Sequence, residues 1–511
     1  MKSGYGNYWD HGVSFISEAH KECGNAVLND QLSQLERTGR IAALPKQPWF
    51  APAKPTARRI GRRAIQRTAR VLLAALLVTL PAARAQTPKP ASRNGGRASA
   101  NAARTLELSL HSPESVGFSS ERLNRLHALM QKFVDERQIP GIVTMLARHG
   151  KVIDYRAYGV RDMASGAPMT KDAIFRDFSM TKPVTGVAMM ILWEQGKWLP
   201  RDPIAKYIPE FAHLKVFKGV DADGKMIVED PIHPPTMQEL MTHTAGFTYG
   251  IFGNTPVDKI YQSANLLRSA SLKEFIDKLS KIPLLYQPGT QWVYSVSSDV
   301  QGYIVEKLSG QSLPDYVQQN IFKPLGMKDA GFFVPADQRH RFATLYDVNS
   351  KGELVTSGFA GAFAAPPRMP SGGGGMVSTA EDYLRLAQML DNAGQLNGVR
   401  ILSPAAVRLM SSNHLAANLL TGKFGTGSLV MRPGLGWGYD CAVEFDPPEL
   451  DLPDGQGTFF WGGLAGTWFW VDPANDIVFV GMIQRVLGPT SPPLQSLSDS
   501  VVYQALVNPK M

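Results

Sequence analysis

The sequence predicts an α+β fold, in which a central antiparallel sheet is flanked by helices and a helical region is inserted into the chain. Two observations predict this fold: apolar strand pairs occur near both ends of the chain, and the long segment between them is rich in helices and loops. The chain has 511 residues, of which 44% are hydrophobic. This length and composition are typical of a globular protein with a large buried core.

The first elements of this fold are a helix and a hairpin. Leu123, Leu126 and Met130 recur at helical spacing, so residues 119–136 are predicted to form an amphipathic helix. Segment 141–159 then holds two apolar runs around a His-Gly pair, which is typical of a β-hairpin.

The C-terminal end contains the same two kinds of element. Segment 467–484 holds two apolar runs around the turn residues Asp-Pro-Ala-Asn. A last helix follows, with core spacing at Val501, Val502, Ala505 and Leu506. We therefore expect a domain over residues 105–511, with an α/β part at about 105–185 and 370–511 and a helical part at about 186–369.

The first 104 residues have the composition of a leader. Residues 58–70 are arginine-rich, residues 71–80 are apolar, and Ala83-Arg84-Ala85 fits a small-residue cleavage site. We expect a signal peptide at 57–85, cleaved near Ala85, that exports the protein to the periplasm or beyond. Both Sec and twin-arginine export remain open. Residues 86–104 are then a linker, and residues 1–56 an extension upstream of the true start.

The leader also accounts for the net charge of +9. Residues 1–85 hold 13 Lys and Arg against 5 Asp and Glu, so the remainder carries a net charge of only +1. This balance argues against a nucleic-acid partner. The apolar run is too short to span a bilayer, so no stable membrane span is expected. Cleavage would leave one cysteine, Cys441, and hence no internal disulfide.

Ser179 and Lys182 lie three residues apart where a helix is predicted to begin. Pro183 falls in or just beyond the first turn, where its missing N–H costs least. Residues three apart share a helix face, so the Lys182 amine would lie close enough to take the Ser179 proton. Burial lowers the proton affinity of a lysine, and a helix N-terminus favours an oxyanion. The alternative is a capping serine beside a solvated lysine, and this spacing alone does not decide between the two.

Tyr294 follows a Pro-Gly-Thr turn in irregular chain. A tyrosine hydroxyl beside a lysine ammonium can lose its proton more easily, and could then act as a general base. The alternative for Tyr294 is a core aromatic.

The strand segment Trp461-Gly462-Gly463-Leu464 lets bare backbone approach a ligand. Its N–H groups could complete an oxyanion hole with the N–H of Ser179. The alternative is that Gly462 and Gly463 form a bulge.

Taken in this order, the motifs resemble the serine β-lactamase and penicillin-binding-protein superfamily, in particular its class C-like branch and the family VIII carboxylesterases. The resemblance covers about residues 110–505 and includes LMTHTAGFTYG (240–250), IFKPLGMKDA (321–330) and SGGGGMVSTAEDYLRLAQML (371–390). It implies a β-lactamase/transpeptidase-like fold. It also implies roles for four residues: Ser179 as acylated nucleophile, Lys182 as its base or proton relay, Tyr294 in proton transfer, and the N–H groups of Ser179 and Leu464 as the oxyanion hole.

Two departures indicate the substrate. The usual Tyr-x-Asn is Tyr294-Ser295-Val296 here, and the usual Lys-Thr-Gly is Trp461-Gly462-Gly463, which removes the cation that would attract a β-lactam carboxylate. Family VIII esterases resemble the chain in both respects, and in the run Tyr-Ser-x-x-x-Asp-Val at 294–300.

We therefore expect a serine hydrolase that cleaves small, uncharged carboxylic esters. Trp461, Gly462 and Gly463 would contact the substrate, with Trp468 and Phe469 as possible walls. The alternatives are a β-lactamase or D-amino-acid peptidase with the same machinery, or a non-catalytic scaffold.

Other conspicuous residues are assigned structural roles. His243 is expected to make structural hydrogen bonds. The four glycines at 372–375 are expected to form a flexible turn beside the cleft, with Ser378 and Glu381 as the capping box of the next helix. No His or carboxylate cluster has zinc-site spacing, so neither a metal nor another cofactor is expected. The oligomeric state remains open.

Overall fold

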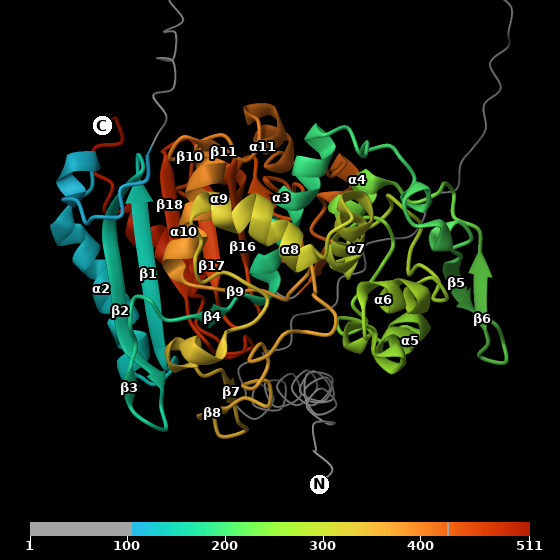
Figure 1. Cartoon of the computed structure of the whole chain (residues 1–511), viewed down its shortest axis with the longest axis horizontal. Helices are drawn as coiled ribbons and strands as arrows, with labels where there is room; N and C mark the ends of the chain where they lie inside the picture. The colour runs from blue at the N-terminus through green and yellow to red at the C-terminus, as the bar shows by residue number, and fades with distance from the viewer. Residues whose placement is uncertain (1–104, 427–428, 511) are drawn as a thin grey trace, which may run out of the picture. The chain divides into compact units, whose positions relative to one another are not determined.

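The computed structural model describes residues 105–426 and 429–510 (Figure 1). The predicted extension, signal peptide and linker at 1–104 lie outside these residues. Within the described ranges, no helix combines the length and apolar character needed to cross a membrane.

The central sheet is antiparallel and has eight strands in the order β14-β15-β16-β17-β18-β1-β2-β3. Strands from the two ends of the domain meet at its centre, where β1 pairs with β18 and Val143 lies opposite Met482. The strands span β1 (Gly141–Arg148), β2 (Lys151–Asp162), β3 (Ala167–Pro168), β14 (Leu435–Trp437), β15 (Ala442–Glu444), β16 (Thr458–Gly462), β17 (Trp468–Asp472) and β18 (Ile477–Met482).

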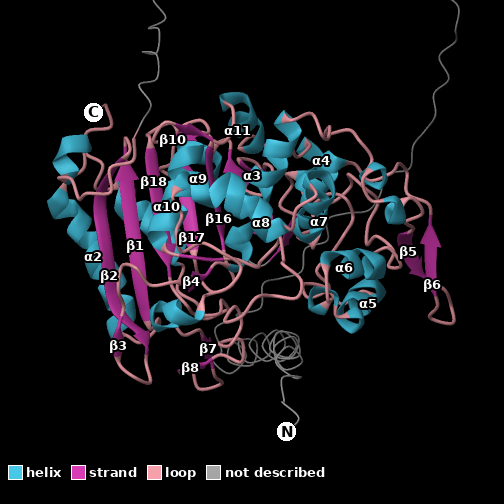
Figure 2. Cartoon of the chain, in the orientation of Figure 1, coloured by secondary structure: helices cyan, strands magenta, loops and turns pink. Residues whose placement is uncertain are grey.

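Both faces of this sheet are covered by helices, and the period-two alternation along each strand assigns its residues to one face or the other. On one face, Ile142 and Leu146 pack into a core shared with α2 (Ser120–Asp135) and α12 (Leu494–Tyr503). On the other, Val143 and Met145 join a larger core that includes α3 (Thr181–Glu194) and α10 (Ala380–Asp391). Figure 2 shows the strand layer with these helices around it.

The chain between α3 and α10 contains more helix than strand, with long loops between its elements. Figure 1 shows β1 and β2 at one side of the view, with α4 to α7 toward the other. The helices of this region are α4 (Met237–Met241), α5 (Pro256–Ala264), α6 (Leu272–Leu279), α7 (Ser297–Ser309), α8 (Leu313–Val317) and α9 (Lys323–Leu325). Beyond α10 lies α11 (Pro404–Met410).

The remaining strands form short pairs. One pair, β4 with β9, sets Phe175 opposite Ser378. The glycine run at 372–375 precedes β9, and Ser179 follows β4. The pairing of β4 with β9 therefore brings the glycine run close to Ser179. The bounds are β4 (Phe175–Arg176), β5 (Val216–Val220), β6 (Met226–Glu229), β7 (Tyr346–Val348), β8 (Leu354–Thr356), β9 (Val377–Ser378), β10 (Gln395–Leu396), β11 (Val399–Arg400), β12 (Phe424–Thr426) and β13 (Leu429–Met431).

The predicted terminal elements are confirmed with small shifts. The first helix begins after Ser119, whose side chain accepts a hydrogen bond from the Arg122 N–H. The hairpin at 141–159 turns at His149, where φ is +54°. The last helix ends at Tyr503, so Ala505 and Leu506 lie beyond it rather than within it.

Candidate active site

Ser179 lies in a single 3₁₀ turn, Phe178–Met180, immediately before α3. Phe178 has φ +44°, a strained conformation for a bulky residue that is typically found at functional sites. The turn is held on both sides, because the Met180 N–H donates to the Asp177 carbonyl and the Tyr383 hydroxyl donates to the Met180 carbonyl. Ser179 is partly exposed to solvent.

Lys182 is in the first turn of α3 and is fully buried, which excludes a solvated first-turn lysine. Its Nζ lies 3.4 Å from Ser179 Oγ, 2.9 Å from the Tyr249 hydroxyl and 2.7 Å from the Gly373 carbonyl. Burial lowers the pKa of Lys182 from 10.5 to about 8, although the nearby charges of Asp299 and Asp440 act to raise it. The pair predicted from the sequence is therefore in place, with an amine that can lose its proton near neutral pH.

Tyr294 lies before α7 and beside the nucleophile, and its hydroxyl hydrogen-bonds with the Ser179 side chain. The prediction that Lys182 promotes loss of the Tyr294 proton is wrong. Lys182 Nζ lies over the Tyr294 ring, 4.5 Å from its centroid, and burial raises the pKa of Tyr294. Tyr294 therefore keeps its proton at neutral pH and can act as a hydrogen-bond donor.

Tyr249 is a site residue that the sequence reasoning missed. Its hydroxyl accepts the shorter of the two hydrogen bonds that Lys182 donates to hydroxyl groups, and its ring packs 5.3 Å from that of Tyr294. Burial raises the pKa of Tyr249 well above its usual value, so this hydroxyl is also protonated. The segment LMTHTAGFTYG contains this tyrosine, but local spacing gives no sign of a contact with a lysine 67 residues away.

The strand predicted to approach the site does so at Gly463. A Cβ at Gly463 would lie 2.1 Å from the Asp177 carbonyl oxygen and 2.4 Å from Thr467 Oγ1, so a side chain would separate this segment from the nucleophile turn. The pairing of β16 with β17 is regular up to Gly462, opposite Trp468, which argues against a bulge. The Leu464 carbonyl accepts from Leu487, whereas the Leu464 N–H has no acceptor among the described residues.

Trp461 contacts Tyr294, because its indole N–H donates to the Tyr294 hydroxyl at 3.3 Å. Trp468 and Phe469, predicted as possible substrate walls, are core residues instead. The Trp468 indole donates to Ser498 on the α12 side of the sheet, and Phe469 packs 5.0 Å from Tyr383 of α10. Both faces of the sheet are covered, so alternate aromatic residues on β17 enter the two cores.

An aromatic cluster surrounds Tyr294. Six rings have centroids between 5.0 and 6.4 Å from the Tyr294 ring, namely those of His243, Tyr249, Phe252, Trp292, Trp437 and Trp461. Phe252 is 52% exposed, and Leu464 and Leu487 are 37% and 45% exposed. These segments therefore present three apolar side chains to solvent.

His243 has a structural hydrogen bond, as predicted. Its Nδ1 lies 3.0 Å from Ser295 Oγ and accepts from the Ser295 N–H, which fixes the loop that carries Tyr294. Burial lowers the pKa of His243 well below its usual value, and the charge of Lys182 lowers it further.

The glycine run forms a turn beside the site, and two of its carbonyls accept hydrogen bonds from α3. Thr185 donates to the Gly372 carbonyl and Lys182 to the Gly373 carbonyl. The predicted capping box is wrong by one residue: Thr379 is the N-cap of α10 and accepts from the Asp382 N–H. Ser378 instead donates to Asp177.

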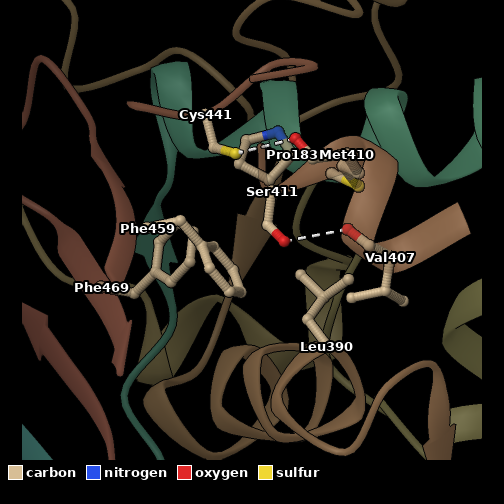
Figure 3. Close-up of a pocket in the computed structure, with 8 residues that line it drawn as sticks. All are labelled: Pro183, Leu390, Val407, Met410, Ser411, Cys441, Phe459 and Phe469. Carbon is tan, nitrogen blue, oxygen red and sulfur yellow. Dashed lines mark hydrogen bonds between the residues drawn. The ribbon is translucent and has the colours of Figure 1, made fainter. Parts of the chain in front are cut away.

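A narrow apolar gap lies below α3, lined by side chains that include Pro183, Met410, Cys441 and Phe469 (Figure 3). It is too narrow to admit a water molecule, so it is a packing gap rather than a ligand site. Cys441 is buried there with a free thiol. Over residues 105–426 and 429–510, no group of three or more His, Cys, Asp or Glu side chains is arranged to hold a metal ion.

An antiparallel sheet between helical layers, with a serine and a buried lysine at the start of a central helix, defines the β-lactamase/transpeptidase fold. Solved structures show the same fold, such as the simvastatin synthase LovD of Aspergillus terreus, with a TM-score of 0.64 over 75% of this chain and 98% of that one at 23% identity. The sequence pattern of the Beta-lactamase family matches residues 126–498, and the chain belongs to this family of serine hydrolases.

Two other relatives have names or descriptions that state an activity. Esterase EstB of Burkholderia gladioli is 32% identical over 399 residues, which cover 74% of this chain and 94% of EstB. The structure of EstCE1, described as a hydrolase with promiscuous acyltransferase activity, is 27% identical and aligns with a TM-score of 0.62 over 76% of this chain and 98% of that one.

Proposed function

We propose that this protein hydrolyses small, uncharged carboxylic esters through an acyl-enzyme on Ser179. The observation that carries the proposal is the position of Lys182: a fully buried amine, 3.4 Å from Ser179 Oγ, whose pKa is lowered to about 8. Its neutral form is a base within reach of the nucleophile. The similarity to an esterase and to a hydrolase supports the same reaction class.

In the proposed acylation step, neutral Lys182 takes the Ser179 proton as Oγ attacks the ester carbonyl carbon. The N–H groups of Ser179 and Leu464 would stabilise the oxyanion. As the carbon–oxygen bond breaks, the Lys182 ammonium gives its proton to the leaving alkoxide, which departs as an alcohol. Water then attacks the acyl carbonyl carbon with Lys182 again as base. The bond between this carbon and Ser179 Oγ breaks, the Lys182 ammonium returns a proton to Oγ, and the carboxylic acid departs.

Tyr294 would act as a donor in this scheme. Its raised pKa keeps the phenol protonated, and its hydrogen bond with Ser179 directs it toward the group where charge changes during the reaction. Trp461 donates to the same hydroxyl and so fixes its position.

The surroundings favour an uncharged substrate. The strand residue beside Tyr294 is Trp461 rather than a cation, and Phe252, Leu464 and Leu487 expose apolar surface near the nucleophile. A β-lactam or a peptide with a terminal carboxylate would gain no ion pair from the strand at this position.

The test compares p-nitrophenyl butyrate with nitrocefin, using the wild type and Ser179→Ala. We expect ester turnover that Ser179→Ala abolishes, and little turnover of nitrocefin. Ser297→Ala is the matched control, because Ser297 is a buried hydroxyl of the same region that hydrogen-bonds with Ser295 rather than Lys182. Comparable nitrocefin turnover would favour a β-lactamase, and failure of a fluorophosphonate probe to label Ser179 would favour a non-catalytic scaffold.

Acyl transfer is a second candidate function, favoured by the description of EstCE1 and by the exposed apolar side chains that could hold an alcohol. In this reaction an alcohol takes the place of water in deacylation. Adding increasing butanol to the p-nitrophenyl butyrate assay would give butyl butyrate if the protein is a transferase, and butyrate alone if it is only a hydrolase.

A further inference from the structure

Asp299 is a buried carboxylate near Lys182 that the proposed reaction does not use. It follows Tyr294 by five residues and lies in the first turn of α7, the helix that packs against α3. The side chain is fully buried. One oxygen, Oδ1, accepts from the Ser371 hydroxyl and from the Gly373 N–H, the latter at 3.2 Å.

Gly373 connects this carboxylate to Lys182. Its N–H donates to Asp299 and its carbonyl accepts from Lys182 Nζ at 2.7 Å, so one residue is fixed between an anion and a cation. Asp299 makes no direct ion pair with Lys182 within the described structure. Its effect on the position of the amine must therefore pass through Gly373.

We propose that Asp299 is a positioning residue, which holds Gly373 so that the Gly373 carbonyl fixes the Lys182 amine beside Ser179. The proposal rests on the proposed role of Ser179 as nucleophile. Lys182 has several rotatable bonds, and the carbonyl fixes one of its donor directions, while Tyr249 accepts another. Small displacements of a catalytic group cost large factors in rate, so fixing Gly373 also matters for the reaction.

The space around Gly373 supports this arrangement. A Cβ at Gly373 would lie 2.8 Å from Asp299 Oδ2 and 2.8 Å from the Tyr249 hydroxyl. Neither Gly373 nor its neighbour Gly374 has a positive φ, so the absence of a side chain, not backbone conformation, is what position 373 requires. At Gly374 a Cβ would make only ordinary contacts, at 3.8 Å from the Phe178 backbone.

Asp299 also acts on Lys182 through its charge, as does Asp440. The titratable and charged groups that face the Lys182 amine are the carboxylates of Asp299 and Asp440, the imidazole of His243, and the hydroxyls of Ser179, Tyr249 and Tyr294. Asp440 accepts from Ser298 and Gln301 and makes no bond to the glycine run. Asp440→Asn therefore removes charge without disturbing Gly373, whereas Asp299→Asn changes both.

The experiment measures the rate of Ser179 labelling by a fluorophosphonate probe between about pH 6 and about pH 9, where a lysine with a lowered pKa titrates. For Asp299→Asn we expect a lower pH midpoint, because the ammonium loses a stabilising charge, and a lower plateau rate. Asp440→Asn should lower the midpoint but keep the plateau. Gly373→Ala should reduce the plateau about tenfold or more, and Gly374→Ala should match the wild type.

The proposal is overturned if either Asp299→Asn or Gly373→Ala keeps the wild-type plateau, or if Asp440→Asn loses the plateau to the same extent as Asp299→Asn. Asp299→Asn and Gly373→Ala decide the question separately, so one variant that fails to fold leaves the other to decide. Labelling also separates this inference from the ester function. A wild type that is labelled at Ser179 but cleaves no ester overturns the ester function and leaves the role of Asp299 to be decided by the plateau rates.

Discussion

The lowered pKa of Lys182 predicts how activity depends on pH. If neutral Lys182 is the base, kcat/KM should rise with pH along a limb of unit slope whose midpoint is about 8. About a tenth of the amine is then neutral at pH 7 and about a hundredth at pH 6, whereas an unshifted lysine would be about one part in 3,000 neutral at pH 7. Burial thus increases the fraction of active base at pH 7 about 300-fold.

The variant that tests this limb is Lys182→Arg, because a guanidinium stays protonated at every accessible pH. Loss of a general base should reduce kcat/KM by about 10²- to 10⁴-fold and remove the limb. The assay is the initial rate of p-nitrophenyl butyrate hydrolysis in buffers of constant ionic strength, with acyl-enzyme formation followed by the burst of p-nitrophenol.

Two neighbouring groups titrate in the same range and must be separated from Lys182. Burial raises the pKa of Asp440 to about 7, and Asp440→Asn removes this titration. Burial raises the pKa of Asp177, two residues before Ser179, to about 8. Asp177→Asn keeps the shape of the side chain and should leave the midpoint unchanged. The reasoning is refuted if the limb disappears in Asp177→Asn, if kcat/KM is independent of pH in the wild type, or if Lys182→Arg retains the wild-type rate.

Three further changes have defined outcomes. Tyr249→Phe removes an acceptor of Lys182 and should lower kcat about two- to tenfold with little change in KM, as measured by steady-state kinetics and expected for one lost hydrogen bond. Gly463→Ala should reduce ester turnover at least about tenfold, because its Cβ would overlap the backbone next to the nucleophile, 2.1 Å from the Asp177 carbonyl. Glu444→Gln should flatten the pH dependence of stability, measured as the urea midpoint at about pH 5 and about pH 9. Burial and the charge of Asp454 raise the pKa of Glu444 from 4.5 to about 9, so the folded state keeps a proton that the unfolded state releases. Wild-type stability therefore falls as pH rises through this range.

Each of these three has its own control. For Tyr249→Phe, Tyr261→Phe changes another buried tyrosine in the helical region, and equal kcat values for the two variants would contradict a role for the Tyr249 hydroxyl. Gly462→Ala places its Cβ no closer than 3.2 Å to any neighbour, so it should be far milder than Gly463→Ala. If the urea midpoints of the wild type and Glu444→Gln change equally between the two pH values, Glu444 is not the titrating group.

The parts of the protein that were predictable from sequence are those fixed by local spacing. The helix predicted at 119–136 and the turn at Asp472 depend on residues within or next to the element itself. The contact of Ser179 with Lys182 is also local, because residues three apart share a helix face. The N-cap of α10 was misplaced by one residue since Ser378 and Thr379 are both good caps, and only the pairing of β9 with β4 directs Ser378 toward Asp177.

The contacts that were missed depend on burial and on distant segments. Tyr249 reaches Lys182 only because the helical region folds against α3, and no spacing in the sequence encodes that distance. The expected acidity of Tyr294 failed for a related reason: the prediction considered a charge beside the hydroxyl, while the structure places the charge over the ring and buries the phenol. Trp468 and Phe469 look alike in sequence, and their roles follow only from the helices that cover each face of the sheet.

The pKa of the Lys182 amine is set by two opposing effects, burial and the charge of nearby carboxylates. Burial alone would lower the pKa of Lys182 further, and full pairing with a carboxylate would keep it protonated and inactive as a base. Here two buried carboxylates act on it without a direct ion pair, and its hydrogen bonds go to a carbonyl and to hydroxyl groups that stay neutral. These acceptors fix the position of the amine but still allow it to lose its proton, because a carbonyl or a protonated hydroxyl stabilises the ammonium less than a carboxylate does. The expected midpoint near pH 8 follows from this arrangement, and any change that turned one of these acceptors into a carboxylate should raise the pKa of Lys182 and stop the reaction at neutral pH.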